Sequence, residues 1–150
     1  MLKTLEIYTD GSSLGNPGPG GWGTVVVDNN TIVKELGGCH KDTTNNRMEL
    51  QAAIEALKYI VREEVETVTI HADSAYVLNG ITSWVFGWEK NGWKTSKKEP
   101  VLNQDLWKEF IGLVREFKGK IIWQKVKGHS GHVFNDKADE IATSKASLQK

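Results

Sequence analysis

The segment Thr43–Val61, TTNNRMELQAAIEALKYIV, carries the clearest helical pattern in the chain and organises the rest of the fold. Its apolar residues recur at the spacing of one helix face: Ala52, Ala53, Ala56, Leu57 and Ile60. The polar TTNN stretch offers candidates for the N-cap. Glu49 stands at helical spacing before this apolar face, so its side chain should point toward the core. A glutamate on that face needs a partner, although capping of the first turn is an alternative interpretation.

Strand-like segments lie on both sides of this helix. Before it, period-two alternation and β-rich composition predict three antiparallel strands at Leu2–Asp10, Trp22–Val27 and Thr31–Leu36, the last two joined by a hairpin at Asp28-Asn29-Asn30. The Gly/Pro-rich stretch GSSLGNPGPGG between the first two is predicted to be a loop. After the helix we predict a strand, one or two short helices, a polar segment, a helix, a strand and a helix, at Val65–Ala72, Ser74–Trp88, Glu89–Glu99, Asn103–Phe117, Lys120–Val126 and Asn135–Ala146.

This order predicts an α/β protein. Its five-stranded mixed sheet would have three antiparallel strands and then parallel additions, with helices flanking the sheet. The length of 150 residues suits a single domain over residues 1–150. Nineteen basic residues balance nineteen acidic ones, so any basic surface for nucleic acid must be local. Cys39 is the single cysteine and permits no internal disulfide. With neither a signal-peptide core nor a bilayer-length apolar run, the expected location is cytoplasmic. The expected state is a monomer, because the fold needs no partner to complete it.

Four carboxylates, Asp10, Glu49, Asp73 and Asp139, come from separate predicted elements that can meet at one edge of the sheet. Each has a simpler interpretation when taken alone: Asp10 as a turn residue, Asp73 as a helix cap and Asp139 as a helix-dipole acid. Carboxylates gathered at about 5 Å would repel by about 3 kcal/mol per pair at an effective dielectric near 20. A bound cation would relieve that repulsion, and an all-oxygen set favours magnesium, with manganese as a substitute.

Several motifs occur in an order and at intervals that resemble the bacterial type 1 ribonuclease H family: YTDGSSLGNPGPGGWG, TTNNRMEL, ADSAYV, NGWKTSKKEPV and VKGHSGH…NDKADEIA. The resemblance covers nearly the whole chain. It implies a ribonuclease H-like fold and endonucleolytic hydrolysis of the RNA strand of RNA–DNA hybrids. It also implies that the four carboxylates are the metal-binding and catalytic acids. Two cations about 4 Å apart would activate a water and stabilise the leaving oxygen.

His129 lies between glycines in the stretch KGHSGH, which suits a mobile imidazole that transfers a proton or assists product release. The resemblance implies this assisting catalytic role, and an ordinary surface-loop histidine is the alternative. We assign no such role to the other histidines, His40, His71 and His132.

The resemblance also implies residues that contact the hybrid. Asn16, Asn45 and Asn46 would line the groove, where amides suit 2′-hydroxyls and base edges, and turn or cap chemistry is their alternative. Thr43 would line a DNA-phosphate pocket, whereas Ala75 stands where a larger polar side chain is expected. A basic and aromatic platform would grip the DNA strand through Trp84, Trp88, Lys90, Trp93, Lys94, Lys97 and Lys98.

This platform is only weakly basic. Glu89 and Glu99 leave two net positive charges between Trp84 and Glu99, and Asn91 replaces an expected basic residue. Hybrid binding is therefore expected to be weaker and less sensitive to salt than in a strongly basic relative. For Trp84 and Trp107, simple burial in the core is the alternative interpretation.

Three other classes of protein are weaker explanations of the same residues. A non-catalytic nucleic-acid-binding module gains nothing from four acids in its groove. A phosphotransferase with a similar strand-Asp-Gly start would need a second, nucleotide-cradling domain. A transposase- or resolvase-like nuclease shares the chemistry, but it should lack the asparagines and the lysine-bearing segment.

Overall fold

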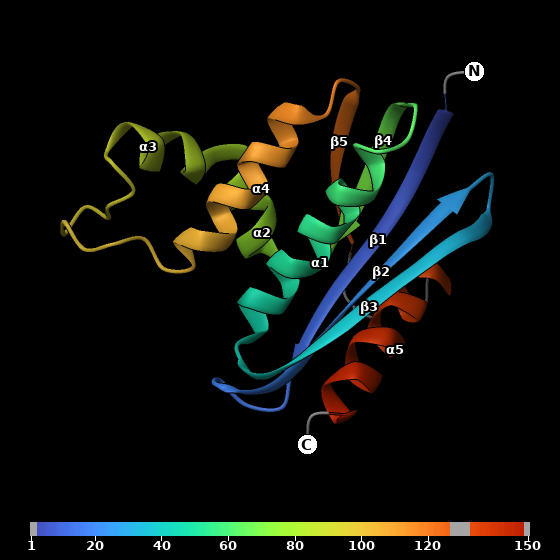
Figure 1. The fold of residues 1–150 in the computed structure, drawn as a ribbon, viewed down its shortest axis with the longest axis horizontal. Coiled ribbons are helices and arrows are strands. Elements are labelled where there is room, and N and C mark those ends of the chain that lie inside the picture. The colour runs from blue at the N-terminus through green and yellow to red at the C-terminus, as the bar shows by residue number, and fades with distance from the viewer. Residues whose placement is uncertain (1–2, 127–132, 149–150) are drawn as a thin grey trace.

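The computed structural model describes residues 3–126 and 133–148. One five-stranded sheet, in the order β3-β2-β1-β4-β5, organises these residues (Figure 1). The strands are β1 (Lys3–Ser13), β2 (Gly18–Asp28), β3 (Thr31–Thr43), β4 (Val65–Ala72) and β5 (Lys120–Lys125). β1, β2 and β3 pair antiparallel, and β4 and β5 add in parallel. The predicted α/β class and mixed sheet are confirmed.

The helices cover the two faces of the sheet unequally (Figure 1). They are α1 (Asn45–Ile60), α2 (Ala75–Asn79), the π-helix η1 (Gly80–Trp84), α3 (Val85–Lys90), α4 (Gln104–Glu116) and α5 (Val133–Leu148). The larger core lies between the sheet and the helices α1 and α4, and it includes Ile7, Leu57 and Phe110. A smaller core around Tyr8 and Ala138 lies under α5. The central strand β1 is therefore buried on both faces. It is also the strand at which the antiparallel and parallel parts of the sheet meet.

The predicted loop after Asp10 is wrong over most of its length. β1 continues to Ser13, and β2 begins at Gly18, so only residues 14–17 lie between the two strands. β3 likewise continues to Thr43 rather than ending at Leu36. Glycines mark these extensions because close packing requires them: a Cβ on Gly21 would lie 2.4 Å from the backbone oxygen of Ala142 in α5. The composition of this stretch reflects a glycine-lined sheet face and not a turn.

Other boundaries follow the sequence more closely. The hairpin at Asp28–Thr31 is present, with Asn29 and Asn30 at positive φ, as a tight two-residue turn requires. Thr44 caps α1 by accepting a hydrogen bond from the backbone N–H of Arg47 at 3.2 Å. The segment after Asp73 forms a continuous α2–η1–α3 run instead of one or two separate helices.

Gly80 allows that run to pack on α4, because a Cβ there would lie 1.9 Å from the Trp107 ring. We expect Gly80→Ala to destabilise the protein by about 1–3 kcal/mol through overpacking. Urea unfolding would measure the effect. Gly87→Ala is the matched control, since a Cβ on this second helical glycine has nothing within 4 Å among the described atoms. It should leave stability unchanged or raise it slightly, and equal losses in both variants would contradict the packing argument.

Candidate active site

Asp10 lies within β1, in register with Gly23 of β2, and its side chain is buried. The alternative interpretation of Asp10 as a turn residue is therefore wrong. Gly11, the next residue, faces α1 so closely that a Cβ would lie 2.3 Å from the backbone nitrogen of Glu49. This close approach brings the first turns of α1 against β1 and places Glu49 beside Asp10.

Glu49 points toward the sheet, as its place on the apolar face of the helix predicts, and only 5% of it is exposed. Its carboxylate accepts a hydrogen bond from the backbone N–H of Gly11. The capping alternative is wrong, since Thr44 caps the helix and Glu49 binds a residue of β1 instead. The same N–H also contacts Asp10 Oδ1 at 2.9 Å, so the two acids converge on one backbone donor.

Asp73 joins these acids from the end of β4. Ser74, and not Asp73, caps α2 by accepting from the Val77 N–H at 3.2 Å, so the cap interpretation of Asp73 is wrong. Lys125 at the end of β5 holds this turn by donating to the Asp73 backbone oxygen at 3.1 Å. Oxygens of Asp10, Glu49 and Asp73 all lie within 4.8 Å of one another.

Asp139 approaches the same group from α5. α5 begins at Val133, so Asp139 lies beyond its first turn. The acid within that first turn, near the positive end of the helix dipole, is Asp136. Its side chain interacts with Asp10 and contributes to the raised pKa of that acid. The close packing of Gly23 on α5, with a Cβ position 2.4 Å from the Ala138 oxygen, holds this part of α5 against the sheet. Asp139 therefore lies near Asp10, but it is exposed and is not one of the three acids whose oxygens lie within 4.8 Å of one another.

The acids are electrostatically costly to hold together. The pKa of Asp10 is raised to about 7, chiefly by burial and also by the neighbouring Asp73 and Asp139, while a hydrogen bond with Glu49 opposes the shift. Burial also raises the pKa of Glu49, followed by the charges of Asp10 and Asp73. The three-acid group without a cation therefore retains a proton near neutral pH. A divalent cation bound by these hard oxygens would replace that proton, so the residues fit a metal site.

The three predicted groove asparagines lie together beside this cluster. Asn16, Asn45 and Asn46 line a pocket of about 520 Å³ with Ser13, Thr44, Leu102 and Asn103. Asn16 accepts a hydrogen bond from the Asn45 backbone N–H at 2.9 Å, and all three side chains are exposed. Thr43 is buried at the end of β3, and its hydroxyl has no hydrogen-bond partner within the described part of the chain. Ala75 is exposed at the first position of α2.

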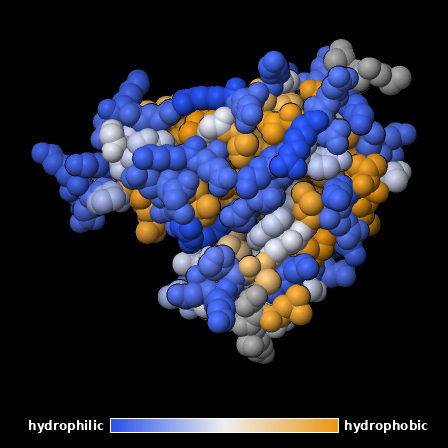
Figure 2. All heavy atoms as spheres, in the orientation of Figure 1, coloured by the Kyte–Doolittle hydropathy of each residue, from blue (hydrophilic) through white to orange (hydrophobic). Residues whose placement is uncertain are grey.

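The lysine-bearing segment Glu89–Glu99, here called the lysine excursion, protrudes beside α3 (Figure 1). Its four lysines, Lys90, Lys94, Lys97 and Lys98, are exposed. Figure 2 shows a hydrophilic surface at this protruding end. Trp84, Trp88 and Trp93 form a chain of rings with centroid separations of 6.0 and 6.1 Å. Trp84 is 41% exposed, so its interpretation as core is wrong, whereas Trp107 is fully buried, as that interpretation predicts.

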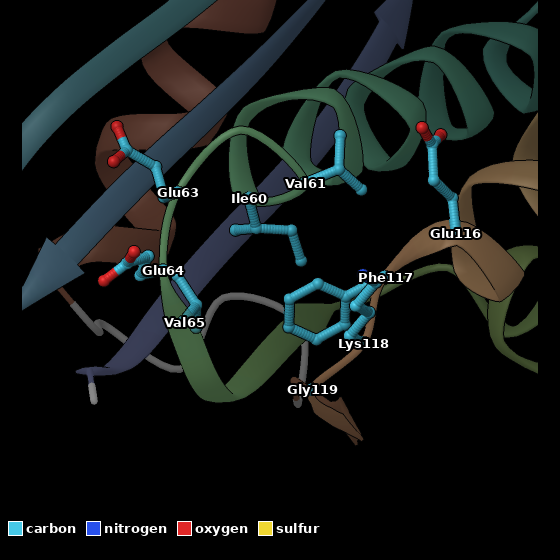
Figure 3. Close-up of a pocket in the computed structure, with 9 residues that line it drawn as sticks. All are labelled: Ile60, Val61, Glu63, Glu64, Val65, Glu116, Phe117, Lys118 and Gly119. Carbon is cyan, nitrogen blue, oxygen red and sulfur yellow. The ribbon is translucent and has the colours of Figure 1, made fainter. Parts of the chain in front are cut away.

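A second pocket of about 520 Å³ lies at the other end of the sheet (Figure 3). It is formed where α1 ends before β4 and where α4 ends before β5, with the side chains of Ile60 and Phe117 facing each other. The carboxylates of Glu63 and Glu64 point away from these two side chains. Because the acid cluster follows the opposite end of β4, this pocket is separate from the candidate active site.

Sequence reasoning missed a polar link beside the groove, made by Arg47, Tyr76, Asn103 and Asp105. In the sequence, only the position of Arg47, two residues before Glu49, hinted at this link. His129 and His132 lie outside the described residues. Among the residues that the structure describes, no helix combines the length and apolarity needed to cross a membrane.

Comparison with known proteins agrees with this geometry. The RNase H family model matches residues 2–147. Ribonuclease H of Mesorhizobium japonicum is 52% identical over 142 residues, or 95% of this chain and 77% of the relative. The crystal structure of LC9-RNase H1, a type 1 RNase H with the type 2 active-site motif, is similar with a TM-score of 0.85 and 33% identity, covering 100% of this chain and 75% of that one.

A likeness in fold extends to LC11-RNase H1 in complex with an RNA/DNA hybrid. The TM-score is 0.72 at 24% identity, and the match covers 96% of this chain and 97% of that one. Both the sequence match over nearly the full chain and the sheet topology lead to one conclusion: the chain belongs to the ribonuclease H family of nucleases.

Proposed function

We propose that this enzyme hydrolyses the RNA strand of RNA–DNA hybrids endonucleolytically, with two magnesium ions held by Asp10, Glu49, Asp73 and Asp139. The convergence of three carboxylate oxygens within 4.8 Å carries the proposal. Manganese would serve as a substitute, because it shares magnesium's preference for oxygen ligands. We further propose that residues 1–150 act as one catalytic domain, as a monomer in the cytoplasm. The site is consistent with a monomer because all four acids come from one chain.

The carboxylates bind and orient in this proposal. When bound, the metal ions would supply an activated water and stabilise charge on the leaving oxygen. A cation that offsets the burial of Asp10 and Glu49 favours their ionised forms, which couples a competent site to metal loading. The shared Gly11 N–H keeps both side chains aimed at the same point.

The asparagine pocket and the lysine excursion would hold the hybrid. Asn16, Asn45 and Asn46 present exposed amides beside the acids, suited to the wide minor groove of an RNA-containing duplex. Thr43 would contact a DNA phosphate, which would give its hydroxyl the hydrogen-bond partner that it lacks among the described residues. We propose that Trp84, Trp88, Lys90, Trp93, Lys94, Lys97 and Lys98 contact the DNA strand. The fold that LC11-RNase H1 uses to bind its hybrid supports this arrangement.

Cleavage of matched duplexes tests the substrate. RNA–DNA, RNA–RNA and DNA–DNA duplexes of one sequence are incubated with the protein, with magnesium and with EDTA. We expect cleavage of the RNA in the hybrid alone, and only with metal. Cleavage of the DNA duplex would instead favour a transposase- or resolvase-like nuclease, and no cleavage of any duplex would contradict the proposal.

Salt dependence tests the lysine excursion. Its surroundings carry only two net positive charges between Trp84 and Glu99, so few counterions are released on binding. We expect the hybrid dissociation constant to rise only modestly between 50 and 200 mM salt, by roughly tenfold. Fluorescence anisotropy in Ca²⁺, to limit cleavage, would measure it. A rise of about a thousandfold would indicate many phosphate contacts and contradict the prediction.

His129 is proposed to assist proton transfer or product release. We expect His129→Ala to lower kcat by about tenfold or more while the affinity for hybrid changes little. Steady-state kinetics beside anisotropy binding would separate the two effects, with His40→Ala as the control. A loss confined to affinity would contradict the proton role.

A further inference from the structure

The Arg47 guanidinium makes a bidentate contact that joins α1 and α4, the two helices that border the asparagine pocket. From the first turn of α1, its guanidinium donates to the two carboxylate oxygens of Asp105, at 3.0 and 2.8 Å. The same Nη1 atom donates to Asn103 Oδ1 at 3.2 Å. Asp105 lies in the first turn of α4, so one side chain ties the beginnings of two helices together.

Asn103 extends this contact toward the aromatic residues. It occupies the N-cap position of α4 in the left-handed conformation, with φ of 61°, and its amide is turned toward Arg47 and Tyr76. Asn103 Nδ2 donates to the Tyr76 hydroxyl at 3.0 Å. The buried Trp107 donates its Nε1–H to that hydroxyl, also at 3.0 Å. The chain of polar contacts thus runs from α1 to the packed aromatic cluster of α2 and α4.

α4 in turn carries the lysine excursion. Gln104 Nε2 donates to the backbone oxygen of Trp93 at 3.1 Å, and Lys108 Nζ lies 5.6 Å from the centre of the Trp93 ring. At the other end of the helix, Arg115 pairs with both carboxylate oxygens of Glu89 at 2.5 Å. The excursion is therefore fixed to α4 at two points. Its position relative to Glu49 depends on how α4 is held against α1.

We propose that Arg47 is a positioning residue that sets the distance between the lysine excursion and the carboxylate cluster, and so fixes which phosphate of a bound hybrid meets the acids. This inference rests on the proposed function. Arg47 stands two positions before Glu49 and directly after Asn45 and Asn46, so it anchors the segment that carries both the groove and one acid. Loosening the contact lets the hybrid bind both surfaces while its register over the acids varies.

A stability role alone would not produce that outcome. The Arg47 and Asp105 side chains are 34% and 66% exposed, and ion pairs with such exposure contribute little to folding. A second ion pair joins the same two helices away from the groove, between Lys58 and Glu109 at 3.2 Å with similar exposure. It offers a matched control, because Glu109→Gln removes the ionic attraction of an α1–α4 contact without touching the pocket.

The test uses a fixed RNA–DNA hybrid with end-labelled RNA, and it compares cleavage positions and kinetics. For Arg47→Ala we expect kcat to fall about tenfold, KM to stay within about threefold, and cleavage to spread to neighbouring phosphates. Arg47→Lys keeps the charge without the planar fork and should fall between wild type and Arg47→Ala. Glu109→Gln should keep the wild-type cleavage positions. The distribution of positions is independent of the folded fraction, so partial unfolding cannot imitate this result.

A double-mutant cycle tests whether Asp105 is the partner through which Arg47 acts. Arg47→Ala, Asp105→Ala and the double variant should spread cleavage to the same extent, because each breaks the same contact. Unchanged cleavage positions in Arg47→Ala, or an equal spread in Glu109→Gln, would overturn the inference while leaving hybrid cleavage established by the wild type. A wild-type protein that leaves the hybrid intact would overturn the proposed function and the inference together.

Discussion

Asp10→Asn is expected to abolish metal-dependent cleavage of the hybrid while leaving the fold intact. The substitution keeps an oxygen that can accept the Gly11 N–H, now 2.9 Å from Asp10 Oδ1, so local structure is preserved. It removes the negative charge from the most central of the clustered acids, which interacts with Glu49, Asp73 and Asp139. Loss of about 4 kcal/mol of transition-state stabilisation corresponds to a roughly thousandfold lower rate.

Single-turnover cleavage with saturating protein measures this loss, and circular dichroism checks the fold. Asp28→Asn is the matched control. It makes the same substitution at the last residue of β2, in the hairpin between β2 and β3. It should cleave as the wild type does. If Asp10→Asn cut the hybrid at the rate of Asp28→Asn, the assignment of Asp10 to the chemistry would be wrong.

Asp10→Asn should also make the metal-free protein more stable at neutral and alkaline pH. In the folded protein, burial raises the Asp10 pKa from its ordinary 3.8 to about 7. Folding therefore favours the protonated acid. The stability associated with this group is fully present below its ordinary pKa and is lost as the pH rises through the raised value. The neutral amide of asparagine carries no such penalty, and we expect a gain of about 2 kcal/mol at pH 8.

Urea unfolding in EDTA, at pH 4 and at pH 8, measures this difference. The variant and the wild type should be similar at pH 4, and the variant should be more stable at pH 8. Asp28→Asn should show no comparable gain. An Asp10→Asn protein that is less stable than the wild type at pH 8 would contradict the cost of holding a charged Asp10 in the folded state.

Much of the site could be predicted from the sequence because its signals are local. The helical spacing of Glu49 against Ala52 and Ala56 fixes the direction of its side chain, and the structure confirms it. The strand that ends before Asp73 is equally clear, since Val68 and Ile70 alternate with polar residues. The positions of Glu49 and Asp73 at one edge of the sheet could therefore be predicted from local patterns alone.

The errors concern positions where distant packing overrides local preference. Gly11 and Gly21 look like turn residues, yet they lie within strands because α1 and α5 pack against them too closely for a Cβ. The left-handed Asn103 and its bond with Tyr76 depend on residues that are 27 positions apart. Periodicity within a single element contains no information on such contacts. The alternative interpretation of Trp84 as a core residue is wrong for the same reason, since the π-helix in which it lies has no simple local signature.

Binding of the metal itself tests the central claim most directly. Isothermal titration of Mg²⁺ into the protein at pH 7.5, without nucleic acid, should show saturable binding to the wild type and to Asp28→Asn. Binding should be lost or strongly weakened in Asp10→Asn and in Asp73→Asn, because each removes one of the oxygens that converge within 4.8 Å. Equal binding by all four proteins would show that these carboxylates do not jointly hold the ion.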